Sequence, residues 1–130
     1  MRILIAEDDF ASRKFMLRFL SKYGECDVTV DGKEAVDAFL MALDNEEGYD
    51  LICLDIMMPV LDGYQALKAI RDIEEERKIP EEKRAKIIMT TALNEGRNVT
   101  KAFELGCMAY AGKPIDQEKF ENALRKLELI

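Results

Sequence analysis

Four short apolar segments of this 130-residue chain each run into residues whose side chains can do chemistry. These residues are Glu7, Asp8 and Asp9 after 2–6, Asp55 after 50–54, Thr91 after 86–90 and Lys113 after 108–111. Taken singly, Asp9 and Thr91 would suit helix caps, and Asp55 would suit a turn. Lys113 alone would suit a solvated surface. One shared site explains the four placements better than four coincidences do.

The chemistry that these residue types favour is phosphoryl transfer to a carboxylate. Crowded carboxylates need a neutralising cation, and oxygen ligands without histidine or thiol neighbours favour Mg²⁺. A carboxylate nucleophile needs no general base at neutral pH. Attack by Asp55 on a phosphoryl donor would give an acyl phosphate, whose oxygens need Mg²⁺, an ammonium and a hydroxyl nearby. Lys113 and Thr91 supply the last two groups.

The absence of histidine excludes several other kinds of site. The chain has no Ser-His-Asp or Cys-His catalysis, no histidine-ligated zinc and no phosphohistidine of its own. Its three cysteines, Cys26, Cys53 and Cys107, are odd in number and far apart, which indicates reduced and mostly buried thiols.

Short apolar runs alternate with amphipathic stretches along the chain. Strands are predicted at 2–6, 27–30, 50–54, 86–90 and 108–111. Helices are predicted from apolar residues at helical spacing at 11–23, 31–43, 64–73, 95–105 and 120–127. Asp31 is a plausible N-cap with Glu34 in the capping-box position, and Gly24 and Gly106 are placed to end helices. This order predicts a parallel sheet covered on both faces, with ligands at the carboxyl ends of its strands.

Charge is unevenly distributed along the chain. The net charge is −7, with 14 acids and 6 bases in residues 1–65 but 12 acids and 13 bases in residues 66–130. No basic face predominates, so nucleic-acid binding is not expected, while the acidic half suits a bound cation. The N-terminal segment lacks a secretory pattern and no apolar run is long enough for a membrane span, so the expected location is the cytoplasm.

The four segments at 3–9, 51–63, 87–92 and 109–114 resemble the receiver domains of two-component response regulators. They read ILIAEDD, LICLDIMMPVLDG, IIMTTA and AYAGKP. The resemblance covers essentially the whole chain. It implies one receiver domain over 1–130 with a flavodoxin-like (βα)5 doubly wound α/β fold. The sheet of such a domain has five parallel strands in the order 2-1-3-4-5.

The resemblance also implies a role for each site residue. Asp55 corresponds to the phosphoacceptor. The implied Mg²⁺ ligands are Asp8 directly, Glu7 through water, Asp55 and the backbone carbonyl of Met57, with Asp9 supporting at most. Thr91 corresponds to the hydroxyl that bonds the phosphoryl group, and Lys113 to the lysine on its oxygens, before a cis bond to Pro114. Thr91 and Tyr110 correspond to the switch pair.

Partners follow from the same resemblance. The phosphoryl donor would be a sensor histidine kinase or a histidine phosphotransfer protein, and the output a downstream protein target or a phosphorylation-dependent homodimer. The contacts expected on the surface of the fourth helix, fifth strand and fifth helix are Arg97, Lys101, Tyr110, Lys119 and Phe120. The expected molecule is a stand-alone, chemotaxis-type switch rather than an enzyme. Apolar Met57 and Leu93 predict slow loss of the phosphoryl group, because neither can orient water.

Several alternatives stay open at this stage. A receiver excised from a larger regulator would show the same motifs. A phosphohydrolase of the haloacid dehalogenase type would share Asp55 and Mg²⁺, but it usually has a second acid where this chain has Met57. A flavodoxin-like electron carrier would need a Ser/Thr/Gly-rich loop where this chain has acids. The charged segment 74–86 is either an exposed, solvated insertion or a contact surface, and Gly112 departs from the common pattern.

Overall fold

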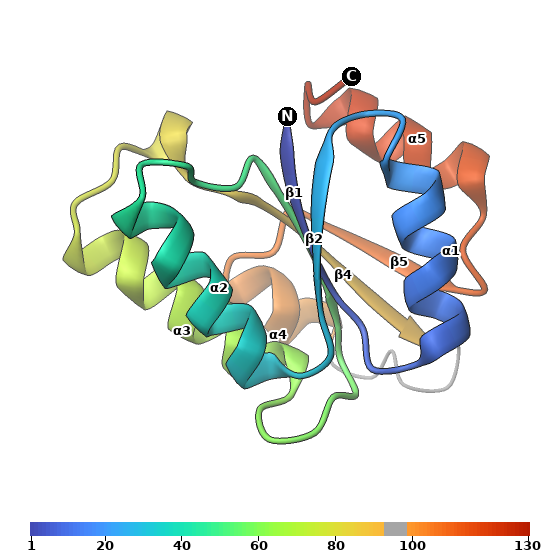
Figure 1. Ribbon diagram of the computed structural model, residues 1–130, viewed down its shortest axis with the longest axis horizontal. Helices are drawn as coiled ribbons and strands as arrows, with labels where there is room; N and C mark the ends of the chain where they lie inside the picture. The colour runs from blue at the N-terminus through green and yellow to red at the C-terminus, as the bar shows by residue number, and fades with distance from the viewer. Residues whose placement is uncertain (93–98) are drawn as a thin grey trace.

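Strands and helices alternate along the whole chain (Figure 1). The computed structural model describes residues 1–92 and 99–130. The strands are β1 (Arg2–Ala6), β2 (Glu25–Thr29), β3 (Leu51–Asp55), β4 (Lys86–Ala92) and β5 (Ala109–Lys113). The helices are α1 (Phe10–Leu20), α2 (Gly32–Asp44), α3 (Gly63–Glu76), α4 (Val99–Glu104) and α5 (Gln117–Lys126), with a short 3₁₀ turn η1 (Glu81–Lys83) before β4.

The five strands form one parallel sheet in the order β2-β1-β3-β4-β5, which confirms the expected fold class and topology. The three central strands are the most apolar and the most buried, as is usual for a sheet covered on both faces. Register aligns the strand ends: Ala6 pairs with Leu54, and Asp55 pairs with Thr90. The polar residues at the carboxyl ends of the strands, of which Asp55, Thr91 and Lys113 lie within β3, β4 and β5, therefore meet at one edge.

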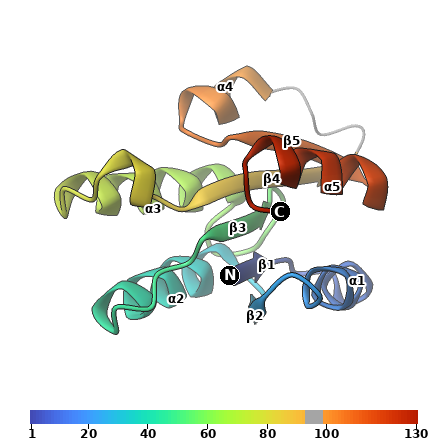
Figure 2. The same ribbon diagram turned by 90° about the horizontal axis from the view of Figure 1, so that it is seen from above.

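Helices cover the two faces of the sheet unequally (Figure 2). α1 and α5 lie on one face, where Phe19 and Phe120 pack edge to face with ring centroids 5.6 Å apart. α2, α3 and α4 lie on the other face, where Phe39, Leu67 and Ala102 join a second apolar cluster. The two clusters together form the core around the sheet.

An aspartate caps the N-terminus of four of the described helices. The side chains of Asp9, Asp31, Asp62 and Asp116 each accept a hydrogen bond from the backbone N–H three residues on. Asp31 is thereby confirmed as a cap, and Glu34 reaches back to the N–H of Val30. Such caps satisfy N–H groups that have no partner inside a helix. The caps at Asp9 and Asp62 fix the starts of α1 and α3, the two helices that follow the site strands β1 and β3.

Some sequence expectations differ from the structure in detail. β2 and β5 are displaced from the predicted 27–30 and 108–111, because strand pairing with their neighbours sets their ends. In α1, Ala11 and Phe15 are exposed, while Met16, Phe19 and Leu20 form its buried face. The helix predicted at 95–105 is described from Val99, and residues 95–98 lie outside the described residues.

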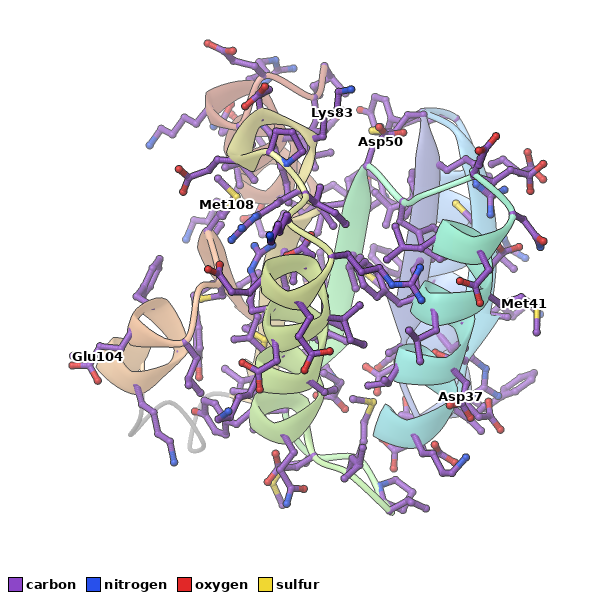
Figure 3. All side chains as sticks on the ribbon, turned by 90° about the vertical axis from the view of Figure 1, so that its left-hand side faces the viewer. Asp37, Met41, Asp50, Lys83, Glu104 and Met108 are labelled. Atoms are coloured by element: carbon purple, nitrogen blue, oxygen red, sulfur yellow. The ribbon has the colours of Figure 1, made fainter. Side chains whose placement is uncertain are left out.

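The segment at 74–86 is exposed along most of its length, as its charge predicted, but Glu74 and Ala85 are buried. Glu74 is only 1% exposed and forms an ion pair with Arg71, so the segment is anchored in the fold at its first residue. Asp50, just before β3, and Lys83, just before β4, line one pocket, away from the carboxyl ends of these strands (Figure 3). The three cysteines are free thiols, as expected. None of the helices described is both long and apolar enough to span a membrane.

Candidate functional site

Three carboxylates converge at the carboxyl ends of β1 and β3. Glu7 and Asp55 are buried, at 2% and 3% exposure, and Asp8 beside them is exposed. One carboxylate oxygen from each of the three lies within 4.8 Å of the others. The structure therefore brings together the acids that the sequence grouped from two separate segments.

Lys113, at the end of β5, is the cation within this group. Its Nζ lies 3.1 Å from Asp55 Oδ1 and forms a second ion pair with Glu7. Burial lowers the pKa of Lys113, but the carboxylates of Glu7 and Asp55 outweigh that effect and hold it above its usual value. Lys113 thus stays charged, and its one ammonium pairs with two of the three carboxylates.

The carboxyl of Asp55 is strongly perturbed. Burial, the largest cause, and the neighbouring Glu7 raise its pKa to about 8, against the opposing effect of Lys113. A carboxyl in this setting favours a proton or a metal cation, because either relieves the repulsion between the acids. Ligands bind to such sheets near the carboxyl ends of the strands, at the point where the strand order reverses. A group with a strongly shifted pKa at that place is a candidate for function.

Close backbone packing holds Asp55 in place. Gly63 starts α3 directly against the end of β3, and its N–H donates to the carbonyl of Ile56 at 2.8 Å. A Cβ atom at residue 63 would lie 2.5 Å from the carbonyl oxygen of Asp55. Glycine is therefore required for the chain to turn so tightly behind this carboxylate.

Asp9 belongs to the helix cap rather than to the acidic cluster. Its carboxylate accepts a hydrogen bond from the N–H of Ser12 at 2.9 Å, and this contact lowers its pKa. Its own N–H donates to Glu7 Oε2 at 3.3 Å. Asp9 therefore supports the turn that carries Glu7, as the cap interpretation predicted.

The remaining predicted residues lie around this cluster. Thr91 is buried near the end of β4, and its hydroxyl donates to the carbonyl of Ala92 at 3.2 Å. The peptide bond between Lys113 and Pro114 is cis, as the resemblance implied. The side chain of Met57 is 57% exposed, and the role of its carbonyl as a ligand stays a prediction. Leu93 lies outside the described residues.

The expected switch surface is only partly as predicted. Lys101 and Lys119 are exposed, and Tyr110 is half-buried with its hydroxyl inside the protein. Phe120 is 2% exposed and packs in the core against Phe19, so its assignment as a partner contact is wrong. An apolar position on an amphipathic helix faces the core unless a neighbour displaces it. Arg97 lies outside the described residues.

Tyr64, which no sequence motif marks as functional, lies beside Tyr110. Burial raises the pKa of Tyr64 to about 12, and the Tyr110 hydroxyl contributes to the same shift. The ammonium of Lys101 lies 5.7 Å from the centre of the Tyr64 ring. Tyr64 therefore links the first turn of α3 to α4 and to the predicted switch residue.

A groove between α1 and the β5–α5 loop opens next to the acidic cluster. Its volume is about 240 Å³, and its lining includes Glu7, Phe15, Lys113 and Pro114. Phe10 nearby on α1 is 69% exposed. Phe15 lines this groove, but its helical spacing placed it among the expected core residues, and this obscured the surface in the sequence.

The donor set of the cluster suits a hard divalent cation. All three side chains offer carboxylate oxygens, and the single ammonium of Lys113 leaves part of their charge unbalanced. Mg²⁺ binds in proteins through one or two carboxylates while keeping several waters. The residues present thus fit the ion that the sequence predicted.

Comparison with known proteins identifies relatives of the whole chain. The family model described as "Response regulator receiver domain" matches residues 3–125. The chain is 31% identical over 96% of its length to "Probable transcriptional regulator ycf29" of Porphyra purpurea, covering 55% of that protein. It is 32% identical over 91% of its length to "Chemotaxis protein CheY" of Treponema pallidum, covering 76% of that protein. The chain thus spans about half the length of some of the curated relatives it matches.

Solved structures with the same fold include two receiver domains, one in complex with a partner and one with a bound metal. The receiver domain of Ssk1, crystallised with the Saccharomyces cerevisiae phosphotransfer protein Ypd1, matches with a TM-score of 0.80 at 28% identity, covering all of this chain and 92% of that one. The receiver domain of the Pseudomonas aeruginosa histidine kinase PA1611, with magnesium in its active site cleft, matches with a TM-score of 0.76 at 27% identity, covering 96% and 94%.

Proposed function

The chain belongs to the response regulator receiver domain family, and on that premise we propose that Asp55 accepts a phosphoryl group from a phosphohistidine of a partner protein. The observation that carries this proposal is the setting of Asp55. Its carboxylate is buried at a sheet edge, 3.1 Å from Lys113 Nζ and beside Glu7. A carboxyl group buried beside a second acid is costly to the fold, and titratable groups perturbed in this way are candidates for function.

In the proposed reaction an oxygen of Asp55 attacks the phosphorus of the donor. The new O–P bond gives an acyl phosphate, and the N–P bond of the phosphohistidine breaks with its electron pair returning to the imidazole. Asp55 reacts as the carboxylate, so no base has to remove a proton from it. Lys113 is proposed to meet the negative charge on the phosphoryl oxygens, and the Thr91 hydroxyl to bond one of them once the adduct forms.

Glu7, Asp8 and Asp55, together with the carbonyl of Met57, are proposed to hold Mg²⁺. When bound, the ion supplies positive charge that draws the phosphoryl oxygens toward Asp55 and relieves repulsion among the acids. Supporting this, the three carboxylates are close enough to share one cation, and a related receiver domain has magnesium in its active site cleft. Ionisation of Asp55 then depends on Mg²⁺ and Lys113 together.

The groove between α1 and the β5–α5 loop is the proposed docking surface for the phosphoryl donor. Glu7 and Lys113 line it, and exposed Phe15 provides apolar area there. Exposed aromatic side chains near a site are typical of protein contacts. A related receiver domain has been crystallised with a histidine phosphotransfer protein, which is the class of partner proposed for this surface.

Output is proposed to follow from a two-state change after phosphorylation. The phosphoryl group would draw Thr91 toward it, Tyr110 would shift in response, and the surface of α4, β5 and α5 would change for a protein target or a second copy of the chain. The phosphoryl group is expected to be lost slowly, because the Met57 side chain cannot orient water by hydrogen bonding. On this proposal the domain is a switch that catalyses only its own phosphorylation and slow dephosphorylation.

The proposal is tested with acetyl phosphate, Mg²⁺ and intact-mass measurement. Wild type should gain one phosphoryl group and Asp55→Asn none. Asp62→Asn is the matched control, because it makes the same change in the following loop and asparagine also caps helices well, so α3 should remain intact. Adducts on both wild type and Asp55→Asn, or on neither, would overturn the assignment. Sustained phosphate release without an adduct would favour the phosphohydrolase alternative.

A further inference from the structure

Arg13 lies in the first turn of α1, directly after the acidic turn, and the reaction proposed above gives it no part. We propose that Arg13 is a positioning residue for the cation site. Through hydrogen bonds to the main chain it would fix the turn that presents the carboxylates of Glu7 and Asp8. This inference rests on the proposed function, because it concerns how the same site binds Mg²⁺.

The contacts of Arg13 point to the backbone of the two acids. Its Nη1 donates to the carbonyl of Glu7 at 3.0 Å and to the carbonyl of Asp8 at 3.3 Å. One guanidinium nitrogen therefore links the two consecutive residues whose side chains offer oxygens to the proposed metal. No side-chain oxygen of the site is consumed by these bonds, so the carboxylates stay available to a cation.

Contacts other than those with Arg13 fix the backbone of Glu7 more firmly than that of Asp8. Glu7 is buried, and its N–H donates to the carbonyl of Thr29 on β2 at 3.1 Å, so the sheet already fixes its backbone. Asp8 lies beyond the end of β1 and is exposed. The bond from Arg13 to the Asp8 carbonyl therefore acts where the sheet no longer orders the chain. Asp8 is the ligand whose position depends most on Arg13.

The location of Arg13 is unfavourable for the helix alone. The N-terminus of a helix carries partial positive charge, so a cation in the first turn costs about 0.3–1 kcal/mol by the dipole effect. The first turns of α1, α3 and α4 hold no acid, whereas those of α2 and α5 contain Glu34 and Glu118; α1 is the case in which an arginine contacts the acidic turn before it. A residue that breaks a local preference beside a candidate site is expected to serve that site.

Charge and position predict opposite effects on Mg²⁺ binding, and this makes the role testable. A guanidinium near the acidic cluster repels a divalent cation, so its removal should tighten binding if charge alone acts. If Arg13 instead positions the turn, its removal should weaken binding, as loss of groups that orient metal ligands typically does by 10–100-fold. The sign of the change therefore separates the two roles.

The experiment is a Mg²⁺ titration of isotope-labelled protein, followed through backbone amide NMR shifts. The variants are Arg13→Ala, Arg13→Gln and Lys14→Ala. Glutamine loses the charge but keeps an N–H donor for the carbonyls. Lys14 is the next residue on α1 and is exposed, so Lys14→Ala removes the same charge as a matched control. Thermal unfolding of the metal-free variants, recorded in parallel, shows that each is folded during the titration.

The expected result is about a tenfold rise in the Kd for Mg²⁺ in Arg13→Ala. Arg13→Gln should recover part of that loss, and Lys14→Ala should bind as tightly as wild type or slightly more tightly. Unchanged or tighter binding by Arg13→Ala would overturn the positioning role, as would an equal loss in Lys14→Ala. Absence of Mg²⁺ binding by wild type is a different outcome, which would overturn this inference together with the proposed metal site.

Discussion

Glu74 and Asp55 are both buried carboxylates, but they lie at opposite ends of the fold in opposite electrostatic settings. Glu74 is 1% exposed; its Oε1 accepts from Arg71 Nη1 at 2.6 Å and its Oε2 accepts from the N–H of Ala85 at 2.8 Å. Arg71 also donates to the carbonyls of Ala85 and Gly106, at 2.8 Å from Nη1 and Nη2 respectively. This pair joins α3, the start of β4 and the turn after α4.

Asp55, by contrast, is incompletely neutralised. It shares the single ammonium of Lys113 with Glu7, and Asp8 lies next to both. Its pKa is raised to about 8, chiefly by burial, whereas Glu74 has one guanidinium to itself. The comparison teaches that burial of charge does not identify a functional site. Unbalanced charge of one sign does, because a proton or a metal cation from outside the chain has to neutralise it.

The largest expected effect concerns Glu74, the buried carboxylate that has a structural role. Arg71→Ala should lower the free energy of unfolding by about 3–5 kcal/mol, because it leaves the buried Glu74 carboxylate without its counter-charge. Urea unfolding followed by circular dichroism measures the change. Lys68→Ala is the control, since Lys68 pairs with Asp72 on the exposed side of the same helix and such pairs contribute under about 1 kcal/mol. Equal losses in both variants would remove the distinction between the two regions.

The next largest effect has the opposite sign. Asp55→Asn should raise the free energy of unfolding of the metal-free protein by about 0.5–2 kcal/mol, a typical gain when a strained functional group is replaced. The reason is that asparagine is neutral at every pH, whereas the metal-free wild type at neutral pH has to protonate Asp55 on folding or bury its charge beside Glu7. Urea unfolding at neutral pH with chelator present is the measurement. A destabilised Asp55→Asn protein would mean that the carboxylate is structural, like Glu74.

The same pKa shift predicts how metal-free stability varies with pH. Because the pKa of Asp55 is about 8 in the folded protein and 3.8 ordinarily, the folded state binds more protons than the unfolded state between those values. The contribution of Asp55 to stability is therefore present below about pH 4 and is lost as the pH rises toward 8. Asp55→Asn should flatten that part of the curve. Identical pH profiles for the two proteins would contradict the assignment.

The smallest expected effect concerns Mg²⁺ and stability. At a Mg²⁺ concentration ten times its Kd, the wild type should gain about 1.4 kcal/mol of unfolding free energy by mass action. Asp55→Asn should gain less, because one proposed ligand is lost. Lys68→Ala should gain as much as wild type, since its ion pair lies outside the site. Thermal unfolding with and without Mg²⁺ measures the gain for all three proteins. A gain in Asp55→Asn equal to that of wild type would contradict Asp55 as a ligand.

The positions of the three central strands were well predicted, although β4 runs two residues beyond its predicted end and includes Thr91. Apolar runs with polar residues after them located β1, β3 and β4 closely, and the caps at Asp31 and Asp9 follow from local side-chain geometry. Phe120 and Glu74 were misjudged, because helical spacing shows which residues share a face but not what covers that face. Burial of Glu74 depends on Arg71 one turn earlier and on Ala85 across the loop.

The sequence by itself determined the order of elements, the fold class and the polar residues that follow the strands. Those features depend on residue type and short-range spacing, which a linear chain displays directly. Only the tertiary structure decided that Lys113 is shared between Glu7 and Asp55, and that Arg13 contacts the carbonyls of the acidic turn. Such facts depend on distances between segments that are far apart in the chain. Packing of the whole sheet sets those distances, and with them the excess negative charge that defines the site.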